Sequence, residues 1–143
     1  MQSNIYVDTN IIIDICDSKR AMHTHSFEVI THYMEQDDYE LFINSDTLAN
    51  LFYILANRST LDTEEVLDKM RFINEIFTLV AIEAKDVETA LTLCADSKSQ
   101  HKDYEDTMQY VCAKKIESSL ILTNDKKFVS ADIELETTPL TYK

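Results

Sequence analysis

The stretch that decides the fold class is Ile5-Tyr6-Val7-Asp8-Thr9-Asn10. Its three apolar residues predict a buried strand, and its three polar residues are types that begin a helix by binding free N–H groups. Asp125 follows a second apolar run at 120–123, and Asp106 opens a helical stretch at 107–115. In an open α/β sheet, groups at the carboxyl ends of parallel strands meet at one edge. We therefore expect aspartates about a hundred residues apart to converge there.

Asp8, Asp106 and Asp125 are the candidate metal ligands and also candidate catalytic residues. Carboxylates that converge repel one another unless a cation lies between them, and sites built from oxygen atoms alone suit Mg²⁺ or Mn²⁺. Each aspartate also has a purely structural interpretation, as a helix cap, a first-turn acid or part of a polar turn. The set favours a metal-dependent nuclease site, because all three acids fall at the same edge of one predicted sheet.

Short apolar runs alternate with amphipathic stretches along the whole chain. Strands are expected at 5–7, 41–43, 79–82, 119–123 and 133–138, the last of them closed by Pro139. Helices are expected at 26–36, 46–57, 85–95 and 104–115, with another that opens at a capping box of Asp62 and Glu65 and a helix or turn at 11–15. This alternation predicts an α/β fold, a three-layer α/β/α arrangement with a mostly parallel central sheet. The length of 143 residues indicates one domain over residues 1–143.

The composition excludes several kinds of site. The chain has no glycine, so it holds no Walker loop, no Gly-x-Gly-x-x-Gly dinucleotide turn and no Gly-x-Ser-x-Gly elbow. Backbone positions that need a positive φ are expected to fall to Asn or Asp. The net charge of −13 is unusual for a protein that binds phosphates. It fits a solvated acidic surface or one covered by a basic partner, and a bound divalent cation would reverse the potential locally.

The cysteines and the apolar runs indicate a cytoplasmic protein. The chain has an odd number of cysteines, which are widely spaced and lie among apolar neighbours: Cys16, Cys94 and Cys112. This pattern favours reduced thiols over a disulfide framework. No apolar run reaches the length of a membrane span, and the first residues lack the basic region of a signal peptide.

Four short motifs, in this order and spacing, resemble the PIN domain family. They are Val7-Asp8-Thr9-Asn10, Asp103-Tyr104-Glu105-Asp106, Thr123-Asn124-Asp125 with Phe128, and Thr138-Pro139-Leu140. The resemblance covers essentially the whole chain and implies a ribonuclease fold with a parallel sheet and an acidic pocket for Mg²⁺ or Mn²⁺. Many small bacterial members of this family are VapC-like toxins, which a cognate antitoxin holds inactive. The resemblance also implies a homodimer.

By position, Asp8, Asp106 and Asp125 match the family's metal-binding acids. Asn50 stands where the family usually has Glu, on the helix after the second strand. Because Asn offers one neutral carbonyl oxygen in place of a carboxylate, metal affinity should fall, and Asp46, one helical turn earlier, is a candidate to compensate. We assign Asn50, together with Thr123, to orienting waters around the metal. The resemblance suggests products with 3′-hydroxyl and 5′-phosphate ends.

The resulting hypothesis is a metal-dependent endoribonuclease that cleaves structured RNA such as tRNA, the toxin of a type II toxin–antitoxin pair. A small neighbouring gene is expected to encode the antitoxin, whose C-terminal segment would insert into the acidic groove. The alternative is a PIN-like scaffold with a weakened site that acts as a binding module, which Asn50 and the net charge favour. A receiver domain is disfavoured because Glu83 and Ala84, rather than an acceptor Asp, follow the third strand. A haloacid-type phosphatase is disfavoured because Asn10 stands where a second Asp is needed.

Other residues near these motifs are assigned structural roles. The four histidines show no convincing metal-ligand spacing, and His101 with Lys102 is expected to face solvent, with RNA contact as the alternative. The lysine pair at 126–127 is expected to form an ordinary basic turn, with phosphate contact as its alternative. Tyr53 and Tyr110 are expected to pack in the core.

Overall fold

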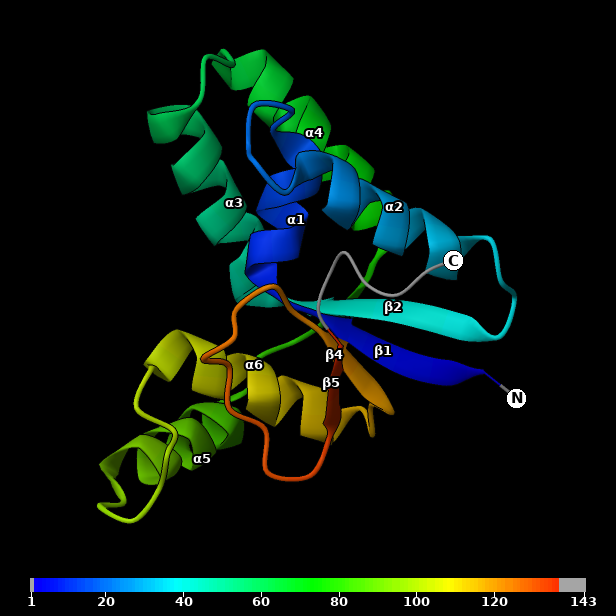
Figure 1. The fold of residues 1–143 in the computed structure, drawn as a ribbon. Helices are drawn as coiled ribbons and strands as arrows, with labels where there is room; N and C mark the ends of the chain where they lie inside the picture. Colours follow the sequence, from blue (N-terminus) through cyan, green and yellow to red (C-terminus); the bar gives the residue numbers. More distant parts are fainter. Residues whose placement is uncertain (1, 137–143) are drawn as a thin grey trace.

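The structure, a computed structural model of the chain, describes residues 2–136, in which strands alternate with helices (Figure 1). The strands are β1 (Ser3–Val7), β2 (Tyr39–Asn44), β3 (Thr78–Val80), β4 (Leu120–Leu122) and β5 (Glu134–Glu136). The helices are α1 (Thr9–Cys16), α2 (His23–Met34), α3 (Ser45–Arg58), α4 (Thr63–Ile76), α5 (Ala84–Ala95) and α6 (Tyr104–Lys115). The expected strand at 133–138 is shorter within this range, and Pro139 with the Thr138-Pro139-Leu140 motif lies outside the described residues.

Within residues 2–136 the strands form one five-stranded sheet in the order β3-β2-β1-β4-β5, and every neighbouring pair is parallel. The first strand of the chain therefore lies in the middle of the sheet. Its register with β4 places Val7 opposite Leu122. Asp8 and Thr123, the next residues, consequently leave the sheet at the same edge.

Alternation along the strands separates two apolar layers. Ile5 and Val7 belong to a core that includes buried residues of α1–α4, whereas Tyr6 belongs to a second core with residues of α5 and α6. Successive side chains of a strand point to opposite faces, so one three-residue run serves both layers. Figure 1 shows α1–α4 on one side of the sheet and α5 and α6 on the other. The predicted three-layer α/β/α arrangement is confirmed.

Over the described range, four helices begin at polar residues whose side chains cap the first turn, and Asn44 is the cap of α3. The side chain of Asp8 caps α1, and Asp62 with Glu65 forms the predicted capping box of α4. Asp103 caps α6, whose bounds agree with the predicted 104–115. A side-chain oxygen at this position satisfies one of the free N–H groups of the first helical turn.

Helix α2 differs from its prediction, since it spans His23–Met34 instead of 26–36. Met22, the residue before it, offers no side-chain cap. The start of α2 is instead joined to α1, since His23 Nδ1 lies 2.7 Å from the backbone oxygen of Asp14, nine positions earlier. A local pattern does not contain such a contact, which is why the start of the helix was misplaced.

A residue with a positive φ closes helix α6. Among the described residues only Glu117 has a positive φ, of 53°. Its N–H donates to the Lys114 carbonyl and the N–H of Ser118 donates to the Ala113 carbonyl, the two bonds of a Schellman motif. The expectation that Asn or Asp would take such positions is wrong, because these helix-closing bonds hold Glu117 in a conformation that costs roughly 1–2 kcal/mol.

The exposed fractions of two tyrosine side chains test the prediction that both pack in the core. Tyr110 is buried, as predicted, whereas Tyr53 is 65% exposed, so the prediction that it packs in the core is wrong. The buried stripe of α3 runs through Leu51 and Leu55, and Tyr53 lies between them on the opposite face.

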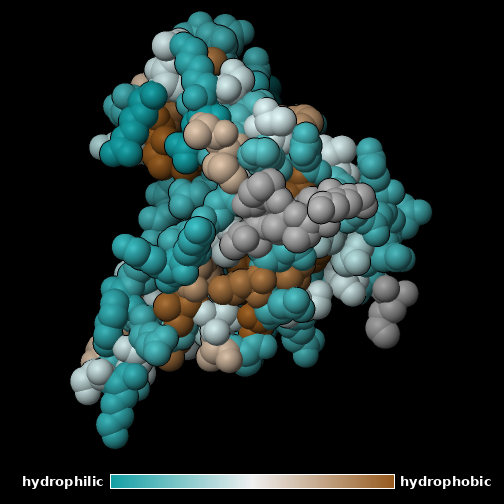
Figure 2. Space-filling model, in the orientation of Figure 1, coloured by the Kyte–Doolittle hydropathy of each residue, from teal (hydrophilic) through white to brown (hydrophobic). Residues whose placement is uncertain are grey.

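Hydrophilic residues cover most of the face seen in Figure 2, and hydrophobic residues gather in a band across its middle. The cysteines are free, with Cys16 and Cys112 buried. No helix in the described part of the chain is both long and apolar enough to cross a membrane.

Candidate metal centre

Asp8 is held at the carboxyl end of β1 by its backbone and by its side chain. Its N–H donates to the Leu122 carbonyl at 2.9 Å, which extends the pairing of β1 with β4 by one residue. Oδ2 accepts from Thr123 Oγ1 at 2.7 Å, and Oδ1 accepts from Gln109 Nε2 at 2.9 Å. Asp8 is 1% exposed, and burial raises its pKa although the bonds from Thr123 and Gln109 oppose the shift.

Asp106 lies in the first turn of α6, where its N–H donates to the Asp103 carboxylate at 3.0 Å. Burial, followed by the negative charge of Asp8, raises the pKa of Asp106 to about 7. The charges of Asp103 and Asp125, and the nearness of the Asp125 carboxyl group, add to this shift. These acids therefore lie close enough to oppose one another's ionisation.

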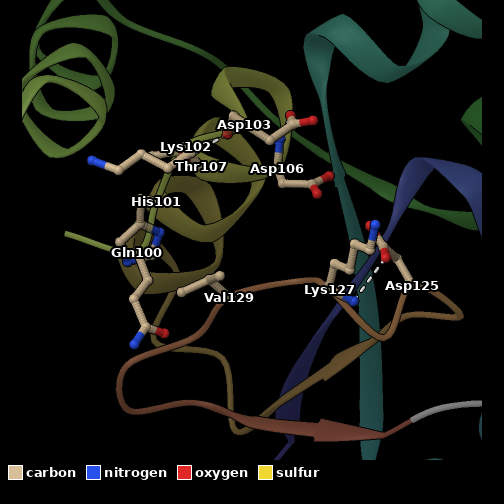
Figure 3. A pocket seen from close by; sticks show the side chains of 9 residues that line it. All are labelled: Gln100, His101, Lys102, Asp103, Asp106, Thr107, Asp125, Lys127 and Val129. Carbon is tan, nitrogen blue, oxygen red and sulfur yellow. Dashed lines mark hydrogen bonds between the residues drawn. The ribbon is translucent and has the colours of Figure 1, made fainter.

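Asp125 lies in the turn after β4. Its N–H donates to Thr123 Oγ1 at 3.0 Å, and its Oδ1 accepts from the Lys127 N–H at 2.8 Å. Figure 3 shows Asp106 and Asp125 reaching from α6 and from this turn toward the same pocket, of about 240 Å³. The structure thus brings Asp8, Asp106 and Asp125 together at one edge of the sheet.

A buried acid ties the turn that carries Asp125 to α1 and α2. Asp14 forms an ion pair with Arg20, with 2.7 Å between Oδ1 and Nε. Its Oδ2 accepts from Ser26 Oγ at 2.8 Å and from Asn124 Nδ2 at 3.1 Å. Because Asn124 directly precedes Asp125, this cluster fixes the turn from behind.

Asn50 lines a second, neighbouring hollow of about 210 Å³, whose lining does not include the three aspartates. Its Nδ2 donates to Glu105 Oε1 at 3.3 Å. Asp46 lines the same hollow and is exposed. Burial raises the pKa of Glu105, and the charges of Asp103, Asp8 and Asp46 raise it further. The structure therefore places a carboxyl group beside the neutral amide of Asn50.

The pocket between the facing aspartates also has basic side chains in its wall. His101, Lys102 and Lys127 line it (Figure 3). His101 is 8% exposed, and its ring packs against Tyr110 with 4.9 Å between the ring centroids. The prediction that His101 faces solvent is therefore wrong, whereas Lys102 is exposed as predicted.

The chemistry of the three aspartates fits a hard divalent cation, because carboxylate oxygens are the donors that Mg²⁺ and Mn²⁺ prefer. Burial and the neighbouring charges of Asp8 and Asp125 raise the pKa of Asp106, and a cation bound between the carboxyl groups would relieve this repulsion. Within residues 2–136, no three His, Cys, Asp or Glu side chains are grouped closely enough to enclose a metal ion. A pair of carboxylates on one pocket still fits Mg²⁺. Proteins usually bind Mg²⁺ through one or two carboxylates, while the ion keeps several of its waters.

Comparison with known families places this site in context. The family model of the PIN domain matches residues 5–134. This chain belongs to the PIN domain family. It is similar to Ribonuclease VapC1 of Aquifex aeolicus (strain VF5), with 37% identity over 134 residues, which cover 94% of this chain and 90% of that relative. The resemblance read from the sequence motifs is confirmed.

Solved structures of low sequence identity share the fold of this PIN domain. VapBC2 from Rickettsia felis, bound to a DNA fragment from its promoter, superposes with a TM-score of 0.69 at 16% identity, covering 94% of this chain and 98% of that chain. VapC20 from Mycobacterium tuberculosis, a Sarcin-Ricin loop cleaving toxin, superposes with a TM-score of 0.70 at 13% identity, covering 87% of this chain and 92% of that chain. At this identity the similarity establishes the fold alone.

Two residues that contact the predicted site in this PIN domain were not singled out from the sequence. Gln109 follows Asp106 by three positions, and residues at that spacing share a face of a helix, which is the signal that could have identified it. Glu105 stands inside a quoted motif. Its contact with Asn50, however, joins residues 55 positions apart and has no local signature.

Proposed function

We propose that this PIN domain is a Mg²⁺- or Mn²⁺-dependent endoribonuclease and the toxin of a type II toxin–antitoxin pair. The observation that carries the proposal is the pair of Asp106 and Asp125 on one pocket, with the buried Asp8 near enough for its charge to raise the pKa of Asp106. The similarity to Ribonuclease VapC1 supports the reaction class, because it extends over 94% of the chain.

Asp8, Asp106 and Asp125 are the residues that would hold the cation. A bound divalent cation supplies two things that phosphodiester hydrolysis needs, a water of lowered pKa and compensation for charge on the phosphate oxygens. Thr123 and Gln109 each donate to one oxygen of Asp8 and so restrict its rotation.

Two further roles belong to the same proposal. Asn50 orients water near the cation, and cleavage leaves a 3′-hydroxyl and a 5′-phosphate. Thr123, expected to share the water-orienting role, is fully buried and holds Asp8 instead. Asn50 brings one neutral oxygen. The carboxyl group of Glu105, whose Oε1 lies 3.3 Å from Asn50 Nδ2, compensates for the charge that Asn50 lacks.

The proposed substrate is structured RNA such as tRNA. Lys102 and Lys127 line the pocket between Asp106 and Asp125, so a phosphate bound there meets positive charge. On a chain with a net charge of −13, such local cations are what allows a polyanion to approach the acidic site.

Cleavage by the purified chain, freed of any partner, tests this proposal. With a tRNA transcript as substrate, we expect fragments in Mg²⁺ or Mn²⁺ and none after EDTA removes the cation. Separation on denaturing gels, with labelling of the fragment ends, measures both the rate and the end groups. RNA that stays intact with either cation, combined with no Mn²⁺ binding in calorimetry, would show the proposal to be wrong.

A second candidate function is a PIN-like scaffold with a weakened site that acts as a binding module. The neutral side chain of Asn50 favours the binding module. The acid that it contacts is Glu105, which is not one of the three aspartates. Calorimetry with Mn²⁺ separates the two candidates, because a weakened site gives no saturable binding whereas the proposed enzyme binds the ion.

The proposed partner is an antitoxin protein whose C-terminal segment inserts into the acidic pocket. Another part of the same partner docks in a trough between α2 and α4. Two adjoining hollows, of about 390 and 480 Å³, form this trough. Most of its lining is apolar, and its charged lining residues are three acids and one lysine: the apolar side chains include Ile15, Phe27, Ile30, Met34, Phe72 and Ile76, and the charged ones are Glu35, Glu65, Asp68 and Lys69. A mostly apolar lining with more acids than bases, on a chain of charge −13, fits a partner segment whose apolar side chains are flanked by Lys or Arg. A homodimer remains a prediction of the family resemblance.

Phe72→Asp is expected to abolish co-purification with the product of the neighbouring gene while leaving RNA cleavage by the free chain unchanged. Phe72 is 46% exposed in the trough, and a charge there opposes burial of a partner's apolar side chain. Phe52→Asp on α3 is the matched control, since Phe52 is exposed to a similar degree outside the trough. Full retention of the partner by Phe72→Asp would exclude this trough as the docking site.

A further inference from the structure

Gln109 is a buried polar residue that joins α6 to α1. It is 2% exposed, and its side chain reaches Thr9 and Asp8, residues one hundred positions earlier in the chain. A buried amide is stable only when both of its ends find partners. Gln109 meets this condition through residues next to the candidate metal centre.

The orientation of the Gln109 amide is fixed by its oxygen. Oε1 accepts from the Thr9 backbone N–H at 2.9 Å and lies 3.2 Å from Thr9 Oγ1, which also donates to it. The opposite orientation would place the NH₂ group against the Thr9 N–H, donor against donor. Nε2 must therefore point to Asp8, where it donates to Oδ1 at 2.9 Å.

Thr9 is itself held in place, so the amide rests on a rigid support. Thr9 Oγ1 lies 3.0 Å from Thr47 Oγ1 on α3. Thr47 in turn donates to Asn44 Oδ1, through its backbone N–H at 3.1 Å and through its hydroxyl at 3.3 Å. The chain of contacts runs from the end of β2 through α3 and α1 to α6.

We infer that Gln109 is a positioning residue, which fixes the direction of the Asp8 carboxylate for binding a divalent cation. Thr123 holds Oδ2 and Gln109 holds Oδ1, so the carboxylate cannot rotate while both donors are present. Partners of this kind, one step behind a metal ligand, orient the ligand and raise affinity for the ion. The inference rests on the proposed function, since it assigns Gln109 a part in the same metal site.

Gln109→Met tests the inference, because Met has a similar length and no donor. We expect the Kd for Mn²⁺, measured by calorimetry, to rise by about 10- to 100-fold. Circular dichroism should show that the variant keeps its helix content. Gln36→Met, just beyond the end of α2, is the matched control and should leave the Kd unchanged. A wild-type chain that binds no Mn²⁺ would overturn the proposed function together with this inference. Equal affinity of wild type and Gln109→Met would overturn the inference alone.

A measurement on the wild-type chain covers the case in which Gln109→Met does not fold. In a ¹⁵N-labelled sample, the side-chain NH₂ resonances of Gln109 should move when Mg²⁺ is added, because the oxygen that accepts from Nε2 belongs to a proposed ligand. The side-chain resonances of Gln36 serve as the reference and should not move. Gln109 resonances that stay in place while backbone signals around Asp106 shift would overturn the inference and leave the proposed metal site intact.

Discussion

With Asp106 replaced by Asn, RNA cleavage is expected to disappear while the metal-free protein becomes more stable at pH 8. Asn has nearly the same shape but offers the cation no charged oxygen, so the loss of rate should exceed the roughly 10- to 100-fold typical of residues that only support a ligand. Stability rises because a negative charge that faces Asp8 and Asp125 is removed. Since Asp106 is only partly buried, we expect a gain of about 1 kcal/mol. That corresponds to roughly 3–5 °C in the thermal midpoint.

Two readouts check this double effect, cleavage of RNA in Mn²⁺ and thermal unfolding in EDTA. Asp68→Asn, on the exposed face of α4, removes the same charge far from the pocket and should change neither. Wild-type cleavage by Asp106→Asn would exclude Asp106 as a metal ligand. A lower thermal midpoint of this variant in EDTA would show that Asp106 is not destabilised by its neighbours.

The stability of the metal-free wild-type protein is expected to fall as the pH rises from about 5 to about 8. The pKa of Asp106 is about 7 in the folded protein, above its ordinary value of 3.8, so the folded state binds this proton more tightly than the unfolded chain. The resulting stabilisation is complete below a pH of about 4 and is lost as the pH rises through about 7. The pKa of Asp8 is shifted in the same direction. The carboxyl groups of Asp86 and Asp132 have lowered pKa values, so their contributions change only at more acidic pH.

Mn²⁺ should reverse this trend at pH 8. An ion present at 100 times its Kd adds about 2.7 kcal/mol to the free energy of unfolding, and less at pH 5, where a proton on Asp106 competes with it. Chemical unfolding at both pH values, in EDTA and in Mn²⁺, measures the two effects. Asp106→Asn should show a flatter pH dependence in EDTA than wild type. Equal pH dependence of the two proteins, or no stabilisation by Mn²⁺ at pH 8, would contradict the prediction.

The fold was predictable where its signals are local. Ile5-Tyr6-Val7 alternates between two cores within three residues, and Asp8 caps the next helix, so a buried strand followed by a helix was evident. The bounds of α6 agree with the predicted 104–115, and the structure shows its cap at Asp103. The start of α2 was missed because it depends on a contact with Asp14, and the exposure of Tyr53 depends on which face of α3 meets the core.

For the candidate site, the sequence predicted only which strand ends and helix start carry the three aspartates. Parallel strands carry Asp8 and Asp125 to one edge, and the helix start carries Asp106 there, which topology alone implies. The side chains around them were not predictable. The direction of the Gln109 amide depends on donors a hundred positions away, and the burial of His101 depends on the ring of Tyr110.

Because β1 lies in the middle of the sheet, its two neighbours come from very different distances along the chain. It pairs with β2 from Tyr39 onward, but with β4 only from Leu120 onward. Contacts so far apart in sequence slow folding, and during synthesis from the N-terminus one edge of β1 stays unpaired until β4 has left the ribosome. Asp8 is therefore made long before Asp125. Until the ribosome has added Asp125, the proposed metal centre lacks one of its three carboxyl groups.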